Sequence, residues 1–276
     1  MLKQRFITAL ILAPLVLCGV FLLPPSEFAL FFALIILLAA WEWANLSSIT
    51  HQLLRITYAM SVAVVLYLVL VDVSVLWVLT LSVMWWIIAS LFVLSYPGTV
   101  VFWKHKWVKC LIGFVVLLPM WKALVYIRSA EFLPVENLDT LWLIFYMLLL
   151  VWVADTGAYF AGKAWGKRKL APNVSPGKSW AGAWGGIVAV LFLAVISCFM
   201  MGLSTVMTAQ FILVTIITAA VSIMGDLTES MFKRQRGIKD SSNLLPGHGG
   251  VLDRIDSLVA AIPVFVFLLI TLGWVS

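Results

Sequence analysis

Residues 180–201 read WAGAWGGIVAVLFLAVISCFMM, a run without a charged side chain. A helix needs about 20 apolar residues to cross the hydrocarbon core of a bilayer, and this run supplies them. The whole chain has the same character: of its 276 residues, 64% are hydrophobic and 11% are charged, and the mean hydropathy is +1.11. A soluble domain carries about 25% charged residues. The composition excludes a soluble enzyme and a disordered chain, and it indicates an all-α, polytopic integral membrane protein.

Apolar runs separated by short polar, proline or glycine segments predict about nine transmembrane helices. The first run follows Lys3 and Arg5 and has the layout of a signal peptide. It ends in Leu-Leu-Pro-Pro without a small-residue cleavage site, so we expect a retained helix. The predicted spans lie near residues 5–23, 28–45, 56–71, 75–95, 108–126, 140–160, 180–201, 206–225 and 257–275.

The basic residues test this count independently. If the amino terminus lies inside and the chain crosses the membrane nine times, 16 of the 18 lysines and arginines fall on the cytoplasmic side. The two exceptions are Lys122 and Arg128. The outer segments are mostly acidic, with Glu27, Asp72, Glu131, Glu136 and Asp139. We therefore expect a cytoplasmic amino terminus and a periplasmic carboxyl terminus. The net charge of +6 then reflects membrane topology and not nucleic-acid binding.

The polar residues divide the chain into two regions. Residues 1–135 hold the first five predicted helices, and residues 136–276 form a C-terminal catalytic region with two long cytoplasmic loops, 161–179 and 226–256. A G-x-x-x-G motif, Gly182 to Gly186, begins the seventh span, and its spacing allows close helix packing.

The first loop follows a carboxylate near the inner end of the sixth span. Asp155 lies among apolar residues, where a charge has to be paired or coordinated. Either a structural salt bridge or a contact with a cation or substrate would satisfy it. In the loop itself, Gly177-Lys178-Ser179 fits a phosphate contact but not a P-loop, because Pro172 replaces the first glycine and we expect no strand before it.

The second loop brings carboxylates to both sides of a glycine-rich sequence around His248. The residues that would share a helix face are Asp226, Glu229 and Ser230 on one side, and Asp253 and Asp256 on the other. Clustered carboxylates supply the oxygen ligands that Mg²⁺ prefers. Basic side chains neutralise phosphates, and glycines let backbone N–H groups approach an anion. These features predict a metal-assisted phosphate site at the cytoplasmic membrane surface.

The stretch from Ser230 to Asp256 resembles the signature of the bacterial phosphatidate cytidylyltransferase (CDP-diglyceride synthase) family. That signature reads S-x-x-K-R, four residues, K-D, a small residue, and finally P-x-H-G-G-x-x-D-R-x-D. The chain fills its fixed positions with Ser230, Lys233, Arg234, Lys239, Asp240, Ser242, Pro246, His248, Gly249, Gly250, Asp253, Arg254 and Asp256. The elements Trp41-Glu42-Trp43, Asp155-Thr156-Gly157, Ser175-Pro176-Gly177-Lys178 and Gly225-Asp226 also resemble the family, so the resemblance covers the whole chain.

The resemblance implies transfer of CMP from CTP to phosphatidate, giving CDP-diacylglycerol and pyrophosphate, with Mg²⁺ as cofactor. It also implies a bacterial inner-membrane protein whose site faces the cytoplasm, among membrane lipids. We assign metal binding to Asp226, Asp253 and Asp256, with Asp155 as a further candidate. The catalytic set is completed by Lys233, Arg234, Lys239 and Arg254. The residues expected to bind substrate are Lys178, Ser230, Asp240, His248, Gly249 and Gly250.

Two other classes of protein stay open at this point. A secondary transporter would use Asp155, Lys122 and Glu42 within the membrane, but it does not require a carboxylate-rich loop at one face. A CTP-dependent polyprenol kinase would transfer the γ-phosphoryl group in place of CMP. The sequence also leaves open whether a monovalent cation accompanies Mg²⁺ and whether the chain forms a homodimer.

Overall fold

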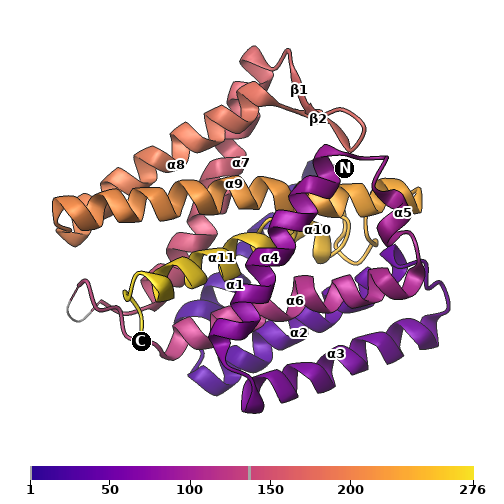
Figure 1. Ribbon diagram of the computed structural model, residues 1–276, viewed down its shortest axis with the longest axis horizontal. Coiled ribbons are helices and arrows are strands. Elements are labelled where there is room, and N and C mark those ends of the chain that lie inside the picture. Colours follow the sequence, from indigo (N-terminus) through magenta and orange to yellow (C-terminus); the bar gives the residue numbers. More distant parts are fainter. Residues whose placement is uncertain (1, 136–137) are drawn as a thin grey trace.

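The computed structural model describes residues 2–135 and 138–276; Glu136, predicted for the outer side, lies outside the described residues. Eleven helices and two strands are assigned in this part of the chain (Figure 1). Their bounds are α1 Leu2–Phe21, α2 Pro25–Leu46, α3 Gln52–Asp72, α4 Val75–Leu94, α5 Val100–Trp103, α6 Lys106–Ser129, α7 Leu141–Trp165, β1 Lys169–Ala171, β2 Ser175–Ser179, α8 Trp180–Met201, α9 Thr205–Arg236, α10 Leu252–Ile255 and α11 Leu258–Thr271.

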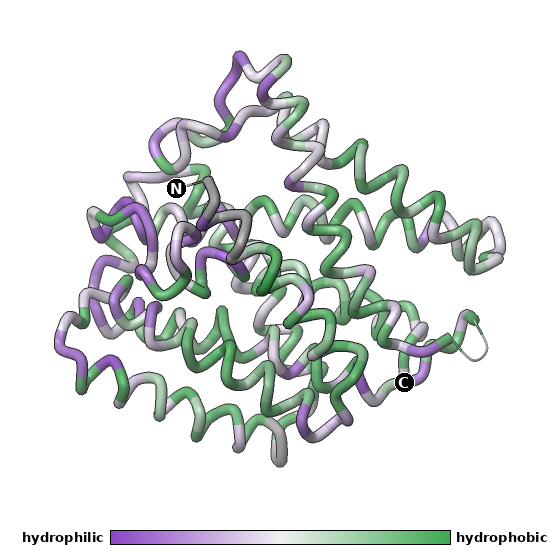
Figure 2. Tube along the Cα trace, turned by 180° about the vertical axis from the view of Figure 1, so that it is seen from behind, coloured by the Kyte–Doolittle hydropathy of each residue, from purple (hydrophilic) through white to green (hydrophobic). Residues whose placement is uncertain are grey.

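The helices confirm the predicted all-α membrane protein. Among the described residues, eight stretches are long and apolar enough to cross a membrane, the last of them being α10 and α11 taken together, Leu252–Thr271. The remaining predicted span corresponds to α1, which contributes a shorter apolar stretch, Thr8–Phe21. The two chain ends lie toward opposite ends of the helix bundle (Figure 1). Most hydrophilic segments gather at the end with the amino terminus and the β1–β2 hairpin (Figure 2).

Five details differ from the prediction. Helix α3 begins at Gln52 and not near residue 56, and α7 continues to Trp165, so the first loop is shorter than expected. Helix α9 continues to Arg236, so about the first third of the second predicted loop is helical. The short helix α10 precedes the last predicted span, and α11 ends at Thr271 and not near residue 275. The antiparallel β1–β2 hairpin was not expected, because its short, proline- and glycine-containing strands lack the residues enriched in strands.

Small residues bring α7 and α8 into close contact. A side chain at Gly186 would collide with the Ala154 carbonyl oxygen, and one at Gly157 would collide with the Gly185 carbonyl oxygen. The predicted close packing of the G-x-x-x-G motif therefore occurs within one chain. Without a strong hydrophobic driving force in lipid, such close backbone approach is a main source of helix association. The contact positions Asp155 of α7 beside the hairpin that leads into α8.

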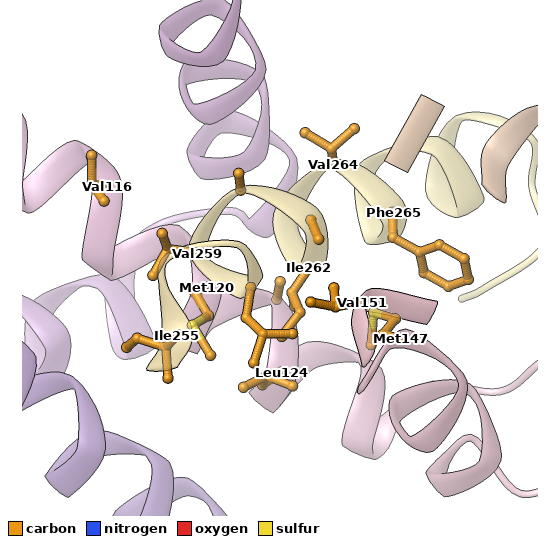
Figure 3. Close-up of a cluster of buried hydrophobic side chains, with 14 of the residues drawn as sticks. Val116, Met120, Leu124, Met147, Val151, Ile255, Val259, Ile262, Val264 and Phe265 are labelled. Carbon is orange, nitrogen blue, oxygen red and sulfur yellow. The ribbon is translucent and has the colours of Figure 1, made fainter. Parts of the chain in front are cut away.

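Helix α11 lies inside the bundle, packed against α4, α6, α7 and α9. Figure 3 shows part of this core, where Ile262 of α11 meets Leu124 of α6 and Val151 of α7. These three side chains are buried, and Ile262 is completely so. Because α11 is almost entirely apolar and largely buried, the short helix α10 that directly precedes it has a fixed place in the fold.

Candidate active site

Helix α9 meets the hairpin through an ion pair. Lys178 Nζ of β2 lies 2.5 Å from Asp226 Oδ2 of α9. One turn along α9, the Ser230 hydroxyl donates to Asp226 Oδ1 at 3.3 Å. The shared helix face of Asp226 and Ser230 is thus confirmed. Both partners of the ion pair keep about a quarter of their side-chain surface exposed, at 28% and 27%, so a substrate can reach them.

Two turns after Asp226, Lys233 joins α9 to α10. Its Nζ donates to Glu229 Oε2 at 2.9 Å and to Asp253 Oδ1 at 2.7 Å. All three side chains are buried. A buried ion pair is stable only when its charges are compensated this closely. Lys233 therefore joins the acidic residues of α9 to those of α10, although Asp253 lies 20 positions further along the chain.

The second oxygen of Asp253 organises the 237–251 loop. Oδ2 accepts hydrogen bonds from the Ser241 N–H at 2.9 Å, the Ser241 hydroxyl at 2.9 Å and the Gly250 N–H at 2.7 Å. Gly249 has a φ of +82°, which favours glycine, and a side chain there would press on Asp253. The glycines of the signature are therefore required by the fold of the loop around Asp253.

Further charges complete one cluster. Glu229 and Asp226 are close enough to Asp256 for their charges to interact, and Asp155 is close enough to Lys178, Asp226 and Arg254. The cluster thus draws on α7, β2, α9 and α10. It brings together Asp155, Lys178, Asp226, Ser230, Lys233, Asp253, Arg254 and Asp256 of the predicted residues.

The other predicted residues lie around this cluster. Arg234 Nε donates to the Val174 carbonyl oxygen at 3.1 Å and so holds the hairpin against α9. Lys239 and Asp240 are exposed at the start of the 237–251 loop. His248 closes a turn of that loop, with its N–H donating to the Leu245 carbonyl oxygen at 2.9 Å.

The cluster has the right donor chemistry for Mg²⁺, because its acidic ligands are oxygen atoms. Among the described residues, however, no three acidic, histidine or cysteine side chains are placed to hold an ion by themselves. Mg²⁺ commonly binds through one or two carboxylates together with substrate phosphates. The residues fit that arrangement and do not form a cage made of protein ligands alone.

A groove opens beside the Lys178–Asp226 pair. It has a volume of about 380 Å³ and runs between α7, α8, α9 and the hairpin. Its lining combines the charged residues Asp155, Lys163 and Lys178 with apolar residues such as Ala158 and Ile223. Such a groove is suited to an amphipathic molecule with a charged head.

The prediction omitted two buried acids from the site. Glu229, noted for its helix face, is the second partner of Lys233. Glu42 of α2 is fully buried, accepts hydrogen bonds from residues 242, 251 and 252, and lies 3.2 Å from the Ser241 hydroxyl. In the sequence, Glu42 stands out as a carboxylate between two tryptophans inside an apolar run. From the sequence alone, a direct role for it is expected only in a transporter.

The chain is similar to known proteins along its whole length. The model of the cytidylyltransferase family matches residues 3–272. A phosphatidate cytidylyltransferase of Pseudomonas aeruginosa is 51% identical over 99% of both chains. One of Haemophilus influenzae is 42% identical over 96% of this chain and 97% of its own, and one of Bacillus subtilis is 43% identical over 57% and 58%. The chain belongs to the cytidylyltransferase family.

Proposed function

We propose that the protein is a phosphatidate cytidylyltransferase, which converts CTP and phosphatidate into CDP-diacylglycerol and pyrophosphate for phospholipid synthesis. The observation that carries the proposal is the pairing of Lys178 with Asp226 and of Lys233 with Asp253 along one face of α9. Full-length similarity to relatives of that name supports it. Both substrates are anionic, so a site of alternating cations and carboxylates, able to recruit further cations, suits their reaction.

The reaction needs no covalent enzyme intermediate. A phosphate oxygen of phosphatidate attacks the α-phosphorus of CTP, a new P–O bond forms, and the bond to the bridging oxygen of the β-phosphate breaks. Pyrophosphate leaves with the electron pair of that bond. Because a phosphate monoester dianion is already nucleophilic, the protein has to align the two phosphates and suppress their repulsion. His248 is therefore assigned to phosphate contact and not to general-base catalysis.

The acidic residues are assigned to Mg²⁺. Asp226, Asp253 and Asp256 would hold the ion, with Asp155 as a further ligand and substrate phosphates completing the coordination. Asp253 suits this role because its Oδ2 is fixed by three donors while Oδ1 faces the cluster. Carboxylates that ligate metals are themselves usually held by hydrogen bonds. When bound, Mg²⁺ would neutralise negative charge on the phosphate oxygens.

The basic residues divide between the substrates. Lys178 and Lys163, which line the groove, are assigned to the phosphate of phosphatidate, and the acyl chains would contact the apolar residues of its lining. The triphosphate of CTP is assigned to the exposed basic side chains Lys239, Arg234 and Arg254. The N–H groups around Gly249 and Gly250 add further donors for an anion.

The same proposal places the protein in the bacterial inner membrane with its site at the cytoplasmic side, where CTP is available. The concentration of hydrophilic segments at the amino-terminal end supports this orientation (Figure 2). A homodimer and a monovalent cation beside Mg²⁺ stay predictions. Crosslinking in native membranes tests the first, and activity in buffers differing in potassium and sodium tests the second.

Labelled CTP tests the proposed reaction directly. Purified protein in mixed micelles is incubated with phosphatidate, Mg²⁺ and CTP labelled at either the α- or the γ-phosphate. We expect α-label in the lipid product and γ-label in pyrophosphate. Transfer of γ-label to phosphatidate or to an added polyprenol would overturn the proposal in favour of a kinase.

A further inference from the structure

We propose that Glu42 of α2 is a positioning residue for nucleotide transfer. Its buried carboxylate clamps the 237–251 loop, which carries Lys239 and His248 and leads into Asp253. The proposal rests on the proposed function and adds a residue that touches neither substrate nor metal. It gives the N-terminal half of the chain a direct part in shaping the site.

Both oxygens of Glu42 are occupied by donors from one segment. Oε1 accepts from the Ser242 hydroxyl at 2.5 Å and from the Val251 N–H at 3.0 Å. Oε2 accepts from the Leu252 N–H at 2.6 Å and lies 3.2 Å from Ser241 Oγ. Glu42 has no exposed surface, and a buried carboxylate is tolerated where such donors satisfy it. The donors lie 199 to 210 positions further along the chain, so these bonds tie α2 to the loop.

Ser241 links Glu42 to the catalytic cluster. Its hydroxyl lies within hydrogen-bond distance of both Glu42 Oε2 and Asp253 Oδ2, while its N–H donates to Asp253. Gly250 is packed into the same place, because a side chain there would collide with Ser241 Oγ and Glu42 Oε1. Glu42 and Asp253 thus both contact Ser241 near the start of the loop. At its end Asp253 accepts from Gly250, and Glu42 accepts from the next two residues.

A second residue of α2 supports the clamp. Asn45, three positions after Glu42 and hence on the same helix face, donates from Nδ2 to the Ser241 carbonyl oxygen at 3.2 Å. Arg236, the last residue of α9, donates from Nε to the Asn45 carbonyl oxygen at 3.1 Å. The inner end of α2 therefore holds the loop and also the helix end from which the loop departs.

The variant E42Q tests the clamp. Gln keeps the volume of Glu, but in either orientation its NH₂ group faces donors that the carboxylate oxygen accepted from. We expect kcat/KM for CTP to fall at least about tenfold, with a raised KM for CTP. The KM for phosphatidate should stay within about twofold, because the groove residues on α7 and α8 do not contact the clamp. Hydrogen exchange should become faster in residues 238–251 and stay unchanged in α7 and α8.

Two further variants keep the test decisive. E27Q changes an exposed glutamate at the start of the same helix, which accepts a hydrogen bond from neighbouring Ser26, and it should behave as wild type. S242A removes one donor while keeping Glu42, and it should lower kcat/KM for CTP by less than E42Q does. It also tests the clamp if the E42Q protein fails to insert into the membrane.

Two results would overturn the clamp: E42Q with wild-type CTP kinetics, or a loss confined to kcat with unchanged loop exchange, as general destabilisation produces. Exchange measured without substrates tests the clamp separately from the proposed function. That function fails instead if the wild-type protein makes no lipid-linked CMP.

Discussion

Lys233 and Asp253 form an ion pair, with 2.7 Å between Nζ and Oδ1, that joins the last turns of α9 to the short helix α10. The same ammonium group contacts Glu229 at 2.9 Å, so one cation neutralises two buried carboxylates. Removing one partner of a buried pair leaves an uncompensated charge. The pair therefore fixes the position of the signature residues on α9 relative to those on α10.

The first prediction concerns stability. Lys233→Met keeps an unbranched side chain, one atom shorter, but removes its charge, leaving Glu229 and Asp253 to repel each other in a buried site. We expect a loss of about 3–5 kcal/mol in unfolding free energy, the range for breaking a buried pair. Thermal unfolding of the detergent-purified protein should show a clearly lower midpoint.

The control for this substitution is Lys167→Met, at an exposed position just after α7. It removes the same charge without uncovering a buried carboxylate, and its midpoint should match that of the wild type. Equal midpoints for all three proteins would show that Lys233 is not needed to hold α9 against α10.

The second prediction separates specific phosphate contacts from general surface charge. If Lys239 contacts a phosphate of CTP, Lys239→Ala should raise KM for CTP or lower kcat by an amount corresponding to about 1.5–3 kcal/mol. Lys169→Ala, in the hairpin, should change little, because we assign that lysine to topology and attraction to anionic lipids. Steady-state kinetics with varied CTP decide the point, and equal effects would indicate surface potential alone.

Much of the fold could be predicted because its signals are local. Each span is a continuous apolar run, and the face shared by Asp226 and Ser230 follows from helical spacing once α9 extends to Arg236. The G-x-x-x-G motif likewise indicated the close approach of α7 and α8. These features depend on residues within a few turns of one another.

The clamp and the hairpin could not be predicted in the same way. The partners of Glu42 lie about two hundred positions away, and no period or spacing connects them. Strand β2 contains a proline and a glycine, which disfavour strands, and it forms because Arg234 and Asp226 of α9 hold the hairpin. Tertiary contacts decide both features, and they exist only once α2, α9 and α10 have assembled.

The third prediction tests the orientation in the membrane. In a cysteine-free background, single cysteines at Asn173 and Asn243 should react with an impermeant reagent only after the inner face is exposed. One at Ser129, exposed at the end of α6, should react in intact cells. The neighbouring outer position Asn137 lies outside the described residues. The reverse labelling pattern would contradict a cytoplasmic site.

The fourth prediction asks what Asp253 does. Asp253→Asn keeps the size of the side chain and one oxygen that can accept from Ser241 and Gly250, so the loop should retain its fold. It removes the negative charge that would attract Mg²⁺. It also breaks the ion pair with Lys233, which keeps Glu229 as a partner, so we expect normal membrane insertion and an unfolding midpoint lowered by less than in Lys233→Met. Activity should be at least about a hundredfold lower, consistent with the loss of several kcal/mol of metal-based stabilisation.

Metal dependence distinguishes a ligand from a residue that only organises the loop. Asp253→Glu keeps the charge but displaces it, and Mg²⁺ demands near-ideal octahedral geometry, so activity should be low yet partly restored by high Mg²⁺ or by Mn²⁺. Asp253→Asn should respond less to either ion. The rate of lipid-linked CMP formation is measured against metal concentration, with thermal unfolding followed on the same samples. A folded Asp253→Asn protein with near-normal turnover and unchanged metal dependence would remove Asp253 from the metal site and leave it a structural role, through the ion pair with Lys233 and the hydrogen bonds to Ser241 and Gly250.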